Sequence, residues 1–237
     1  MLSKPSGLAV LCPTNIEMST KGTVVFDIIG TCFSLDQPRQ RLRGLDAPDY
    51  ALNLWFGQTL RDAFALSHAG SYQPLKQVLE AELPRTLKVL GLAASESELA
   101  WVLNSFSELE LQPDALECFA HLKESGWKLV ALTNGSEEST HKLLEKAGAI
   151  QHFSQIFSCD VIQKTKPHPD VYALVKSDVE ENIWMVAAHA WDIMGAVIAG
   201  LKTAFITQEE KDYLSVYPQP NLIANSLIEA ANQIIES

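Results

Sequence analysis

Five polar side chains in this sequence have the types and the order that nucleophilic catalysis by a carboxylate requires. A carboxylate can attack an electrophilic centre and form an ester, a lysine can neutralise the negative charge that gathers there, and hydroxyl groups can orient the nucleophile. Each of these groups lies at, or in the segment after, the end of a short apolar run. They are Asp27, Thr31, Thr133, Lys166 and Asp192. Their order predicts one shared site.

Each of these residues also has an ordinary structural interpretation. An aspartate after a strand is often the N-cap of a helix, and Thr133 could cap the helix after it. A lysine before a proline, as at Lys166, is usually a solvated loop residue. Asp192 would be favoured near a helix N-terminus by the helix dipole. The spacing of four such signals along one chain favours the catalytic interpretation over four separate coincidences.

The elements that must position these residues follow from hydrophobic periodicity. Short apolar, β-branched runs predict buried strands, and each is followed by a helical pattern. Strands that alternate with helices indicate a parallel sheet covered on both faces, and the carboxyl ends of its strands meet along one edge. The predicted strands are residues 23–28, 128–132, 156–159, 183–187 and 203–206. The predicted fold class is therefore α/β.

A block without any strand signal interrupts this alternation after the first strand. Helical patterns cover residues 46–69 and 75–90, and Ser95 with Glu98 forms a capping box before a third helix. An all-helical insertion at this point would lie as a cap over the carboxyl edge of the sheet. We expect an α/β core of residues 22–34 and 110–237 and a helical cap of residues 35–109. Residues 1–21 are expected to be an N-terminal extension, for which disorder is one interpretation.

Composition limits the classes of partner. The net charge of −11 would repel nucleic acid and anionic membrane surfaces, so the expected partner is a small-molecule substrate. The apolar runs are too short to span a bilayer. The cysteines lack metal or redox spacing, which is typical of a reducing compartment and predicts a cytoplasmic protein. They are Cys12, Cys32, Cys118 and Cys159. Association into a homodimer is left open.

The segments FDIIGT, LTNGS, KPHPDVY and AWD resemble the four ordered motifs of the haloacid dehalogenase superfamily. The resemblance runs from about residue 22 to the C-terminus. Within the superfamily it is closest to the L-2-haloacid dehalogenase branch, with which the chain shares AWD, the spacing of KP and VY, and an LW near the start of the cap. The resemblance implies a Rossmann-like parallel sheet with the first strand central and an inserted all-helical cap. It also implies a hydrolase that works through an aspartyl ester.

The resemblance further assigns a role to each matched residue. Asp27 would attack the carbon that bears the halogen. Tyr172 would line the site near the lysine, Asn134 would help to hold the departing halide, and Asp192 would help to place the hydrolytic water. The residues expected to keep the nucleophile ionised and oriented are Thr31, Thr133 and Lys166.

Ile29 separates two kinds of chemistry within this superfamily. The phosphatases carry an acid two residues after the nucleophile, because an alkoxide leaving group must be protonated. A halide is a weak base and leaves without a proton, so Ile29 is compatible with displacement at carbon. We therefore predict hydrolytic dehalogenation of a small 2-haloacid, with no cofactor and no metal.

Two alternative functions remain at this point. One is a magnesium-dependent phosphatase, in which Asp27, Asp192 and a backbone carbonyl would be the protein's only ligands, because Ala187 stands where a metal-binding acid is usual. The other is a non-catalytic relative that keeps the pocket as a binding module.

The chain departs from the dehalogenase branch at several positions. Phe56 stands where an arginine grips the substrate, and Arg61, one turn further on, is either its substitute or a surface residue. Ala187 and His189 stand where a serine and an asparagine are usual. His189 is expected either to activate water or bind an anion, or to pack beside Trp191. The aromatic residues expected to form an apolar pocket wall are Trp55, Phe56, Phe64 and Trp191.

Overall fold

The computed structural model describes residues 20–176 and 182–237. Nearly all of the expected N-terminal extension therefore lies outside the described residues. A six-stranded, all-parallel sheet organises the molecule, in the order β3-β2-β1-β4-β5-β6. Its strands are β1 (Gly22–Phe26), β2 (Trp127–Thr133), β3 (Phe153–Ser158), β4 (Ile183–Ala187), β5 (Lys202–Ile206) and β6 (Leu222–Ala224). The prediction of a parallel α/β sheet with the first strand inside it is confirmed.

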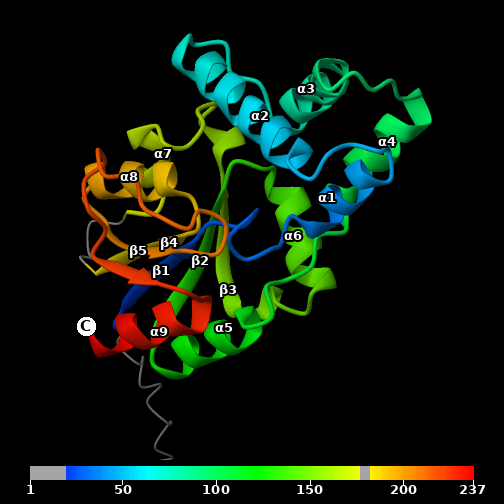
Figure 1. Cartoon of the computed structure of the whole chain (residues 1–237). Helices are drawn as coiled ribbons and strands as arrows, with labels where there is room; N and C mark the ends of the chain where they lie inside the picture. The colour runs from blue at the N-terminus through cyan, green and yellow to red at the C-terminus, as the bar shows by residue number, and fades with distance from the viewer. Residues whose placement is uncertain (1–19, 177–181) are drawn as a thin grey trace, which may run out of the picture.

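Helices cover both faces of the sheet, which explains why β1 is buried along its whole length. Val24 and Phe26 point into a core that includes side chains of α5 (Ala115–Glu124), α6 (Glu137–Lys146) and α9 (Leu227–Glu236). Val25, between them, points to the opposite face, where α7 (Pro169–Ala173) and α8 (Ala190–Ile198) pack. Figure 1 shows α7 and α8 on one side of the sheet and α5 and α9 on the other.

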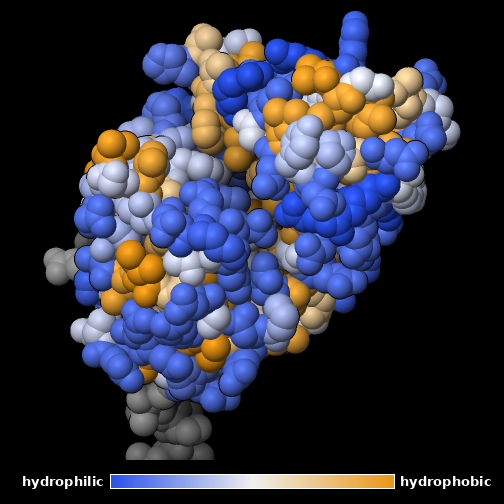
Figure 2. Space-filling model, in the orientation of Figure 1, coloured by the Kyte–Doolittle hydropathy of each residue, from blue (hydrophilic) through white to orange (hydrophobic). Residues whose placement is uncertain are grey.

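The chain between β1 and α5 is helical. It forms α1 (Asp36–Arg43), α2 (Ala51–His68), α3 (Leu75–Val89), α4 (Glu96–Asn104) and a short 3-10 turn, η1 (Ser105–Ser107). In Figure 1, α2 and α3 stand beyond the end of the sheet. On the face drawn in Figure 2, hydrophobic residues gather over this helical end. The division of the chain into core and cap at residues 34/35 and 109/110 stays a prediction.

Several predicted boundaries were wrong, for local reasons. The helix expected from residue 46 begins at Ala51, because Asp46 has a positive φ of 58° and cannot continue a helix. The strongly polar α1 and the three-residue β6 were missed. The capping box of Ser95 and Glu98 is confirmed by its two reciprocal hydrogen bonds.

Within the described ranges, no helix combines the length and the apolar character needed to cross a membrane.

Two helix-interior glycines have opposite surroundings, and this difference predicts opposite effects of substitution. A Cβ on Gly195 in α8 would lie 2.5 Å from Tyr172 Oη and 2.6 Å from Pro167 Cβ, whereas a Cβ on Gly57 in α2 would meet nothing within 4 Å. We expect Gly195→Ala to lower the free energy of unfolding by about 1–3 kcal/mol, because it displaces Tyr172 and the loop before it. Gly57→Ala should raise it by about 0.5–1 kcal/mol, because alanine favours the helix. Urea denaturation measures both, and equal effects of the two substitutions would contradict the close packing at α8.

Candidate active site

Asp27 lies at the carboxyl end of β1, where its backbone N–H donates to Val186 O on β4 at 3.1 Å. Its side chain is buried, and both carboxylate oxygens accept hydrogen bonds. Oδ1 accepts from Lys166 Nζ at 2.7 Å, and Oδ2 accepts from Thr31 Oγ1 at 2.7 Å. No helix starts directly after Asp27, since α1 begins only at Asp36. The helix-cap interpretation of Asp27 is therefore wrong.

Thr31 is oriented by a second contact. Its Oγ1 accepts from the backbone N–H of Ala188 at 2.8 Å, which directs the hydroxyl hydrogen toward Asp27. The chain reaches this position through Gly30, whose φ of 86° permits the sharp turn after β1. Thr31 thus connects the loop after β1 to the end of β4 and fixes the rotamer of Asp27.

Lys166 is fully buried, and its ammonium group uses all three of its donors. Nζ donates to Asp192 Oδ2 at 2.6 Å, to Asp27 Oδ1 at 2.7 Å and to the carbonyl of Leu132 at 3.0 Å. Burial alone would lower the pKa of Lys166, but the charges of Asp192 and Asp27 raise that pKa above its ordinary value. Lys166 therefore stays charged, and its interpretation as a solvated loop lysine is wrong.

Asp192 is the second carboxylate of this cluster. Its Oδ1 accepts from Tyr172 Oη at 2.7 Å, while Oδ2 is held by Lys166. Burial raises the pKa of Asp192, the charge of Lys166 lowers it, and the charge of Asp27 raises it again, so the pKa lies above the ordinary value. Burial and the neighbouring Asp192 also raise the pKa of Tyr172 well above its usual value, so the phenol remains a donor. The structure thus brings together Asp27, Lys166 and Asp192 as predicted, whereas Tyr172 is fully buried and reaches the cluster only through Asp192, so it does not line the space beside Asp27.

Thr133 is the last residue of β2, Asn134 follows it, and both lie beside Asp27 in the same space. Thr133 Oγ1 accepts from Gly135 N at 2.9 Å. The cap of α6 is Ser136, so the alternative in which Thr133 caps this helix is wrong. Asn134 Oδ1 accepts from Lys166 N at 2.9 Å and from Cys159 Sγ at 3.0 Å, so its amide nitrogen is the end that can serve a ligand.

A small chamber of about 20 Å³ lies beside Asp27. This volume has room for roughly one water-sized group. The sheet edge and the helical block both contribute to its walls, since Phe56, Leu60 and Leu75 lie on α2 and α3. The other lining residues are Asp27, Ile29, Thr133, Asn134, Gly135, His189 and Trp191.

Only two of the four aromatic residues expected in the pocket wall line the chamber. Phe56 and Trp191 line the chamber, whereas Trp55 and Phe64 lie behind it. Trp55 is completely buried, with its indole N–H donating to Leu79 O at 3.1 Å, and Phe64 packs edge-on against Trp191 at 5.1 Å between ring centroids.

Arg61 does not replace the arginine that Phe56 displaces. Its side chain is more than half exposed and forms a two-pronged ion pair with Asp62 at 2.7 and 2.9 Å.

His189 packs beside Trp191, which was one of its two predicted interpretations. Its ring is stacked on Trp191, with centroids 5.5 Å apart and planes 12° apart, and lies 6.2 Å from the ring of Phe56. Nδ1 lies 3.4 Å from Glu210 Oε1, while buried Nε2 has no hydrogen-bond partner among the described residues. Burial lowers the pKa of His189, but the hydrogen bond to Glu210 and the charge of Asp27 outweigh it and raise the pKa above its usual value.

Glu210 is the residue of this site that sequence reasoning missed. It lies in the loop after β5, where the sequence has neither a motif nor a hydrophobic period that could have indicated it. Its other oxygen, Oε2, accepts from the backbone N–H of Ala190 at 3.1 Å, which fixes the carboxylate at the start of α8.

The side chains offer a poor donor set for magnesium, an ion that prefers several oxygen ligands. Lys166 lies between Asp27 and Asp192 and uses an oxygen of each, and Ala187 is a buried apolar residue. Among the described residues, no group of three or more histidine, cysteine, aspartate and glutamate side chains is arranged to hold a metal ion.

Fold and site together define a class of enzyme: a parallel α/β protein with a buried carboxylate–lysine–carboxylate cluster at the sheet's carboxyl edge. A sequence model of the haloacid dehalogenase-like hydrolases matches residues 22–200. The chain belongs to the haloacid dehalogenase-like hydrolase family.

Relatives of known activity resemble most of the chain. An (S)-2-haloacid dehalogenase of Xanthobacter autotrophicus is 29% identical over 199 residues, which cover 81% of this chain and 77% of the relative. An (S)-2-haloacid dehalogenase of Pseudomonas putida is 24% identical over 90% of this chain and 96% of its own. The solved structure of L-2-haloacid dehalogenase from Xanthobacter autotrophicus superposes with a TM-score of 0.80, at 25% identity, over 90% of this chain and 98% of that one.

Replacing Lys166 by methionine should destabilise the protein in a pH-dependent way. Removal of the ammonium group leaves buried Asp192 facing Asp27, so we expect the free energy of unfolding at pH 8 to fall by about 3 kcal/mol. Because loss of Lys166 raises the pKa of Asp192 further, the folded state takes up a proton as the pH falls. The deficit should therefore be largest at pH 8 and smaller at pH 5.

Urea denaturation at both pH values measures this effect. Lys164→Met is the matched control, since Lys164 pairs with Asp170 at the surface and should change stability by less than about 0.5 kcal/mol. A deficit at Lys166 that does not depend on pH would contradict the pairing of its charge with buried carboxylates.

Proposed function

We propose that the protein hydrolyses the carbon–halogen bond of a small 2-haloacid through an ester formed on Asp27. The named activity of the relatives from Xanthobacter autotrophicus and Pseudomonas putida supports this reaction. The observation that carries the proposal is the pairing of Asp27 with Ile29 in one chamber. Asp27 is held by Lys166 and Thr31 as an oriented nucleophile, while Ile29 supplies no proton to a leaving group. Such a site suits a leaving group that departs as a stable anion.

The reaction has two steps. A carboxylate oxygen of Asp27 attacks the carbon that bears the halogen, and the halide leaves with the bonding electrons. Water then attacks the carbonyl carbon of the Asp27 ester. The product leaves as a 2-hydroxy acid that carries the original Asp27 oxygen, one proton of the water goes to the product hydroxyl and the other is released. In this scheme Lys166 stabilises the carboxylate, Asp192 and Tyr172 help to place the water, and the amide of Asn134 faces the halide.

We also propose that residues 22–34 and 110–237 form the catalytic core and residues 35–109 its cap. The contribution of Phe56, Leu60 and Leu75 to the chamber supports this division. Homodimer formation and a cytoplasmic location stay predictions from the sequence.

His189 is proposed to bind the anionic end of the substrate. A carboxylate that leaves water needs a donor in the site, and Phe56 supplies none. Among the described residues that line the chamber, His189 is the one that can carry a positive charge. With Nδ1 directed to Glu210, the protonated ring has one remaining N–H, at Nε2, to donate. Lys166 cannot take this role because its three donors are already used.

Oxygen transfer from Asp27 tests the nucleophile directly. In a single turnover in heavy-oxygen water, with enzyme in excess, the product should be unlabelled and the label should appear in the peptide that contains Asp27. Asp27→Asn should lower the rate of halide release at least about a thousandfold. The protein should stay folded, since the two side chains are nearly the same size. Labelled product in the first turnover would show direct attack by water on the substrate instead. A parallel assay of phosphate release with and without magnesium excludes or establishes the phosphatase alternative.

The pH dependence of KM tests His189 and Glu210. The pKa of His189 is raised, so its cation persists below that raised pKa and is lost as the pH increases through it. KM for a haloacid should therefore rise on the alkaline side. Glu210→Gln removes an acid that raises this pKa and should move the increase in KM to lower pH, with a smaller effect on kcat. His189→Phe, which keeps an aromatic ring beside Trp191, should raise KM about tenfold or more at acid pH.

The matched control is Glu145→Gln, since Glu145 lies 3.9 Å from the exposed His141 on α6, away from the chamber. Halide release between pH 5 and pH 9 measures all of these variants. The charges that face His189 are Glu210 from the loop after β5, Asp27 after β1 and Asp192 on α8. An unchanged pH profile in Glu210→Gln would rule out the proposed His189–Glu210 pair.

A further inference from the structure

A second, larger cavity opens directly beside the chamber. This cleft has a volume of about 480 Å³, within the range of small-molecule binding sites. Three residues line both spaces: Ile29, Leu75 and Gly135. The chamber has room for roughly one water-sized group, so a larger molecule held at Asp27 needs further space, and the cleft is the space that shares lining residues with the chamber.

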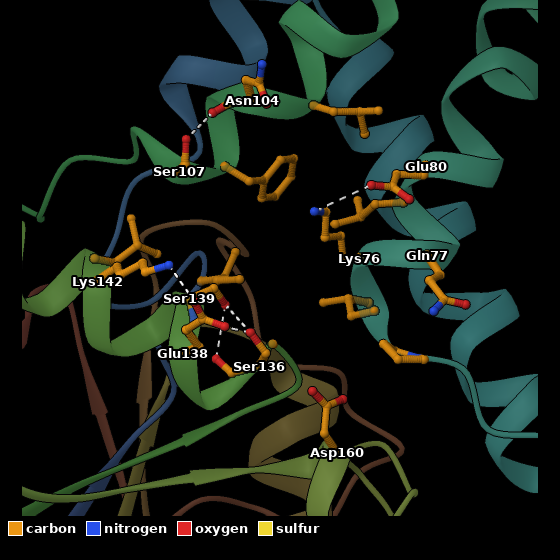
Figure 3. Close-up of a pocket in the computed structure, with 18 residues that line it drawn as sticks. Lys76, Gln77, Glu80, Asn104, Ser107, Ser136, Glu138, Ser139, Lys142 and Asp160 are labelled. Carbon is orange, nitrogen blue, oxygen red and sulfur yellow. Dashed lines mark hydrogen bonds and ion pairs between the residues drawn. The ribbon is translucent and has the colours of Figure 1, made fainter.

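The walls of the cleft come from the helical block and from the sheet edge. Figure 3 shows α3 with Lys76 on one side and α6 with Lys142 on the other, both pointing into the space between. Leu103 and Phe106, at the end of α4 and in η1, close a third side and are only partly buried. The apolar lining residues are Ile29, Leu75, Leu79, Leu103, Phe106 and Leu143.

The charges at the rim indicate which kind of group the cleft accepts. Lys76 lies 3.8 Å from Glu80, and Lys142 donates to Glu138 at 2.5 Å, so each lysine already faces an acid. Asp160 adds a further negative charge to the lining. Two lysines against three acids leave no surplus positive charge for a second carboxylate. The remaining polar lining residues are uncharged, and the partly buried Leu103 and Phe106 add apolar surface, so the lining favours a neutral, mainly apolar group. These uncharged polar residues are Gln77, Asn104, Ser107, Ser136 and Ser139.

We propose that this cleft binds the C2 substituent of the substrate, and that the preferred substrate is a 2-haloacid whose C2 substituent is neutral, mainly apolar and larger than a methyl group. The inference rests on the proposed haloacid hydrolysis at Asp27. Ile29 has a double role in this arrangement: it lacks the acid of a phosphatase, and it lines both the chamber and the cleft.

A substrate series tests the proposal in the wild-type protein. Halide release is measured for 2-chloropropionate, 2-chlorobutanoate, 2-chlorohexanoate and 2-chloro-3-phenylpropanoate. Each methylene that leaves water for an apolar wall should improve kcat/KM by up to about fourfold. We expect kcat/KM for 2-chlorohexanoate to exceed that for 2-chloropropionate by at least about tenfold, mainly through KM.

Variants at α4 locate the effect. Leu103→Trp fills the cleft and should lower the ratio of kcat/KM for 2-chlorohexanoate over 2-chloropropionate about tenfold or more. Leu103→Ala removes one wall and should lower the same ratio about threefold, which keeps the test valid if tryptophan disturbs the fold. The matched control is Leu99→Ala, one turn earlier on α4, partly buried in the same way but not lining the cleft. It should leave the ratio within twofold of wild type.

The outcomes separate this inference from the proposed function. Release of halide from 2-chloropropionate with no gain for longer substrates would overturn the role of the cleft and leave the dehalogenase function intact. An equal change of the ratio in the Leu99 and Leu103 variants would also overturn it. Absence of halide release from every member of the series would overturn both.

Discussion

The buried ammonium group of Lys166 is the interaction on which the rest of the site depends. Two carboxylates from different elements, Asp27 after β1 and Asp192 on α8, lie 2.7 and 2.6 Å from Nζ, and the side chains of Lys166 and Asp192 have no exposed surface. Without a cation between them, these two negative charges would repel one another in a medium that screens charge poorly. Asp27 and Asp192 can lie this close together at the edge of the sheet because the loop after β3 delivers a lysine between them.

This cluster also limits what the site can bind. One ammonium group and two carboxylates sum to a negative charge, so an anionic substrate requires a further cation or donor. In the proposed function this comes from the core, through His189 and Glu210, instead of from the cap, where Phe56 contributes only an apolar surface. A histidine also differs from an arginine in being able to lose its charge near neutral pH, which makes substrate binding depend on pH.

In the proposed mode of binding, the helical block contributes to specificity mainly through shape. Its residues at the chamber are apolar, and in the cleft between α3, α4 and α6 its Lys76 is paired with Glu80, so that it offers no surplus charge. In this proposal the chemistry takes place at the sheet edge, while the C2 substituent of the substrate contacts side chains of the helices. In such an arrangement, the size of the accepted substituent can change without moving the nucleophile.

The sequence by itself determined the parallel sheet and the convergence of Asp27, Lys166 and Asp192. Hydrophobic runs define strands locally, and parallel topology then forces their carboxyl ends together, so order along the chain is sufficient information. The tertiary structure alone decided the functions of side chains whose direction depends on packing. Trp55 and Phe56 are adjacent in a helical pattern, yet only Phe56 faces the chamber. Arg61 turns to Asp62, and Glu210 reaches His189 from a loop without any periodic pattern. Contacts of this kind join residues whose separation in sequence carries no signal, and only the packed fold defines them.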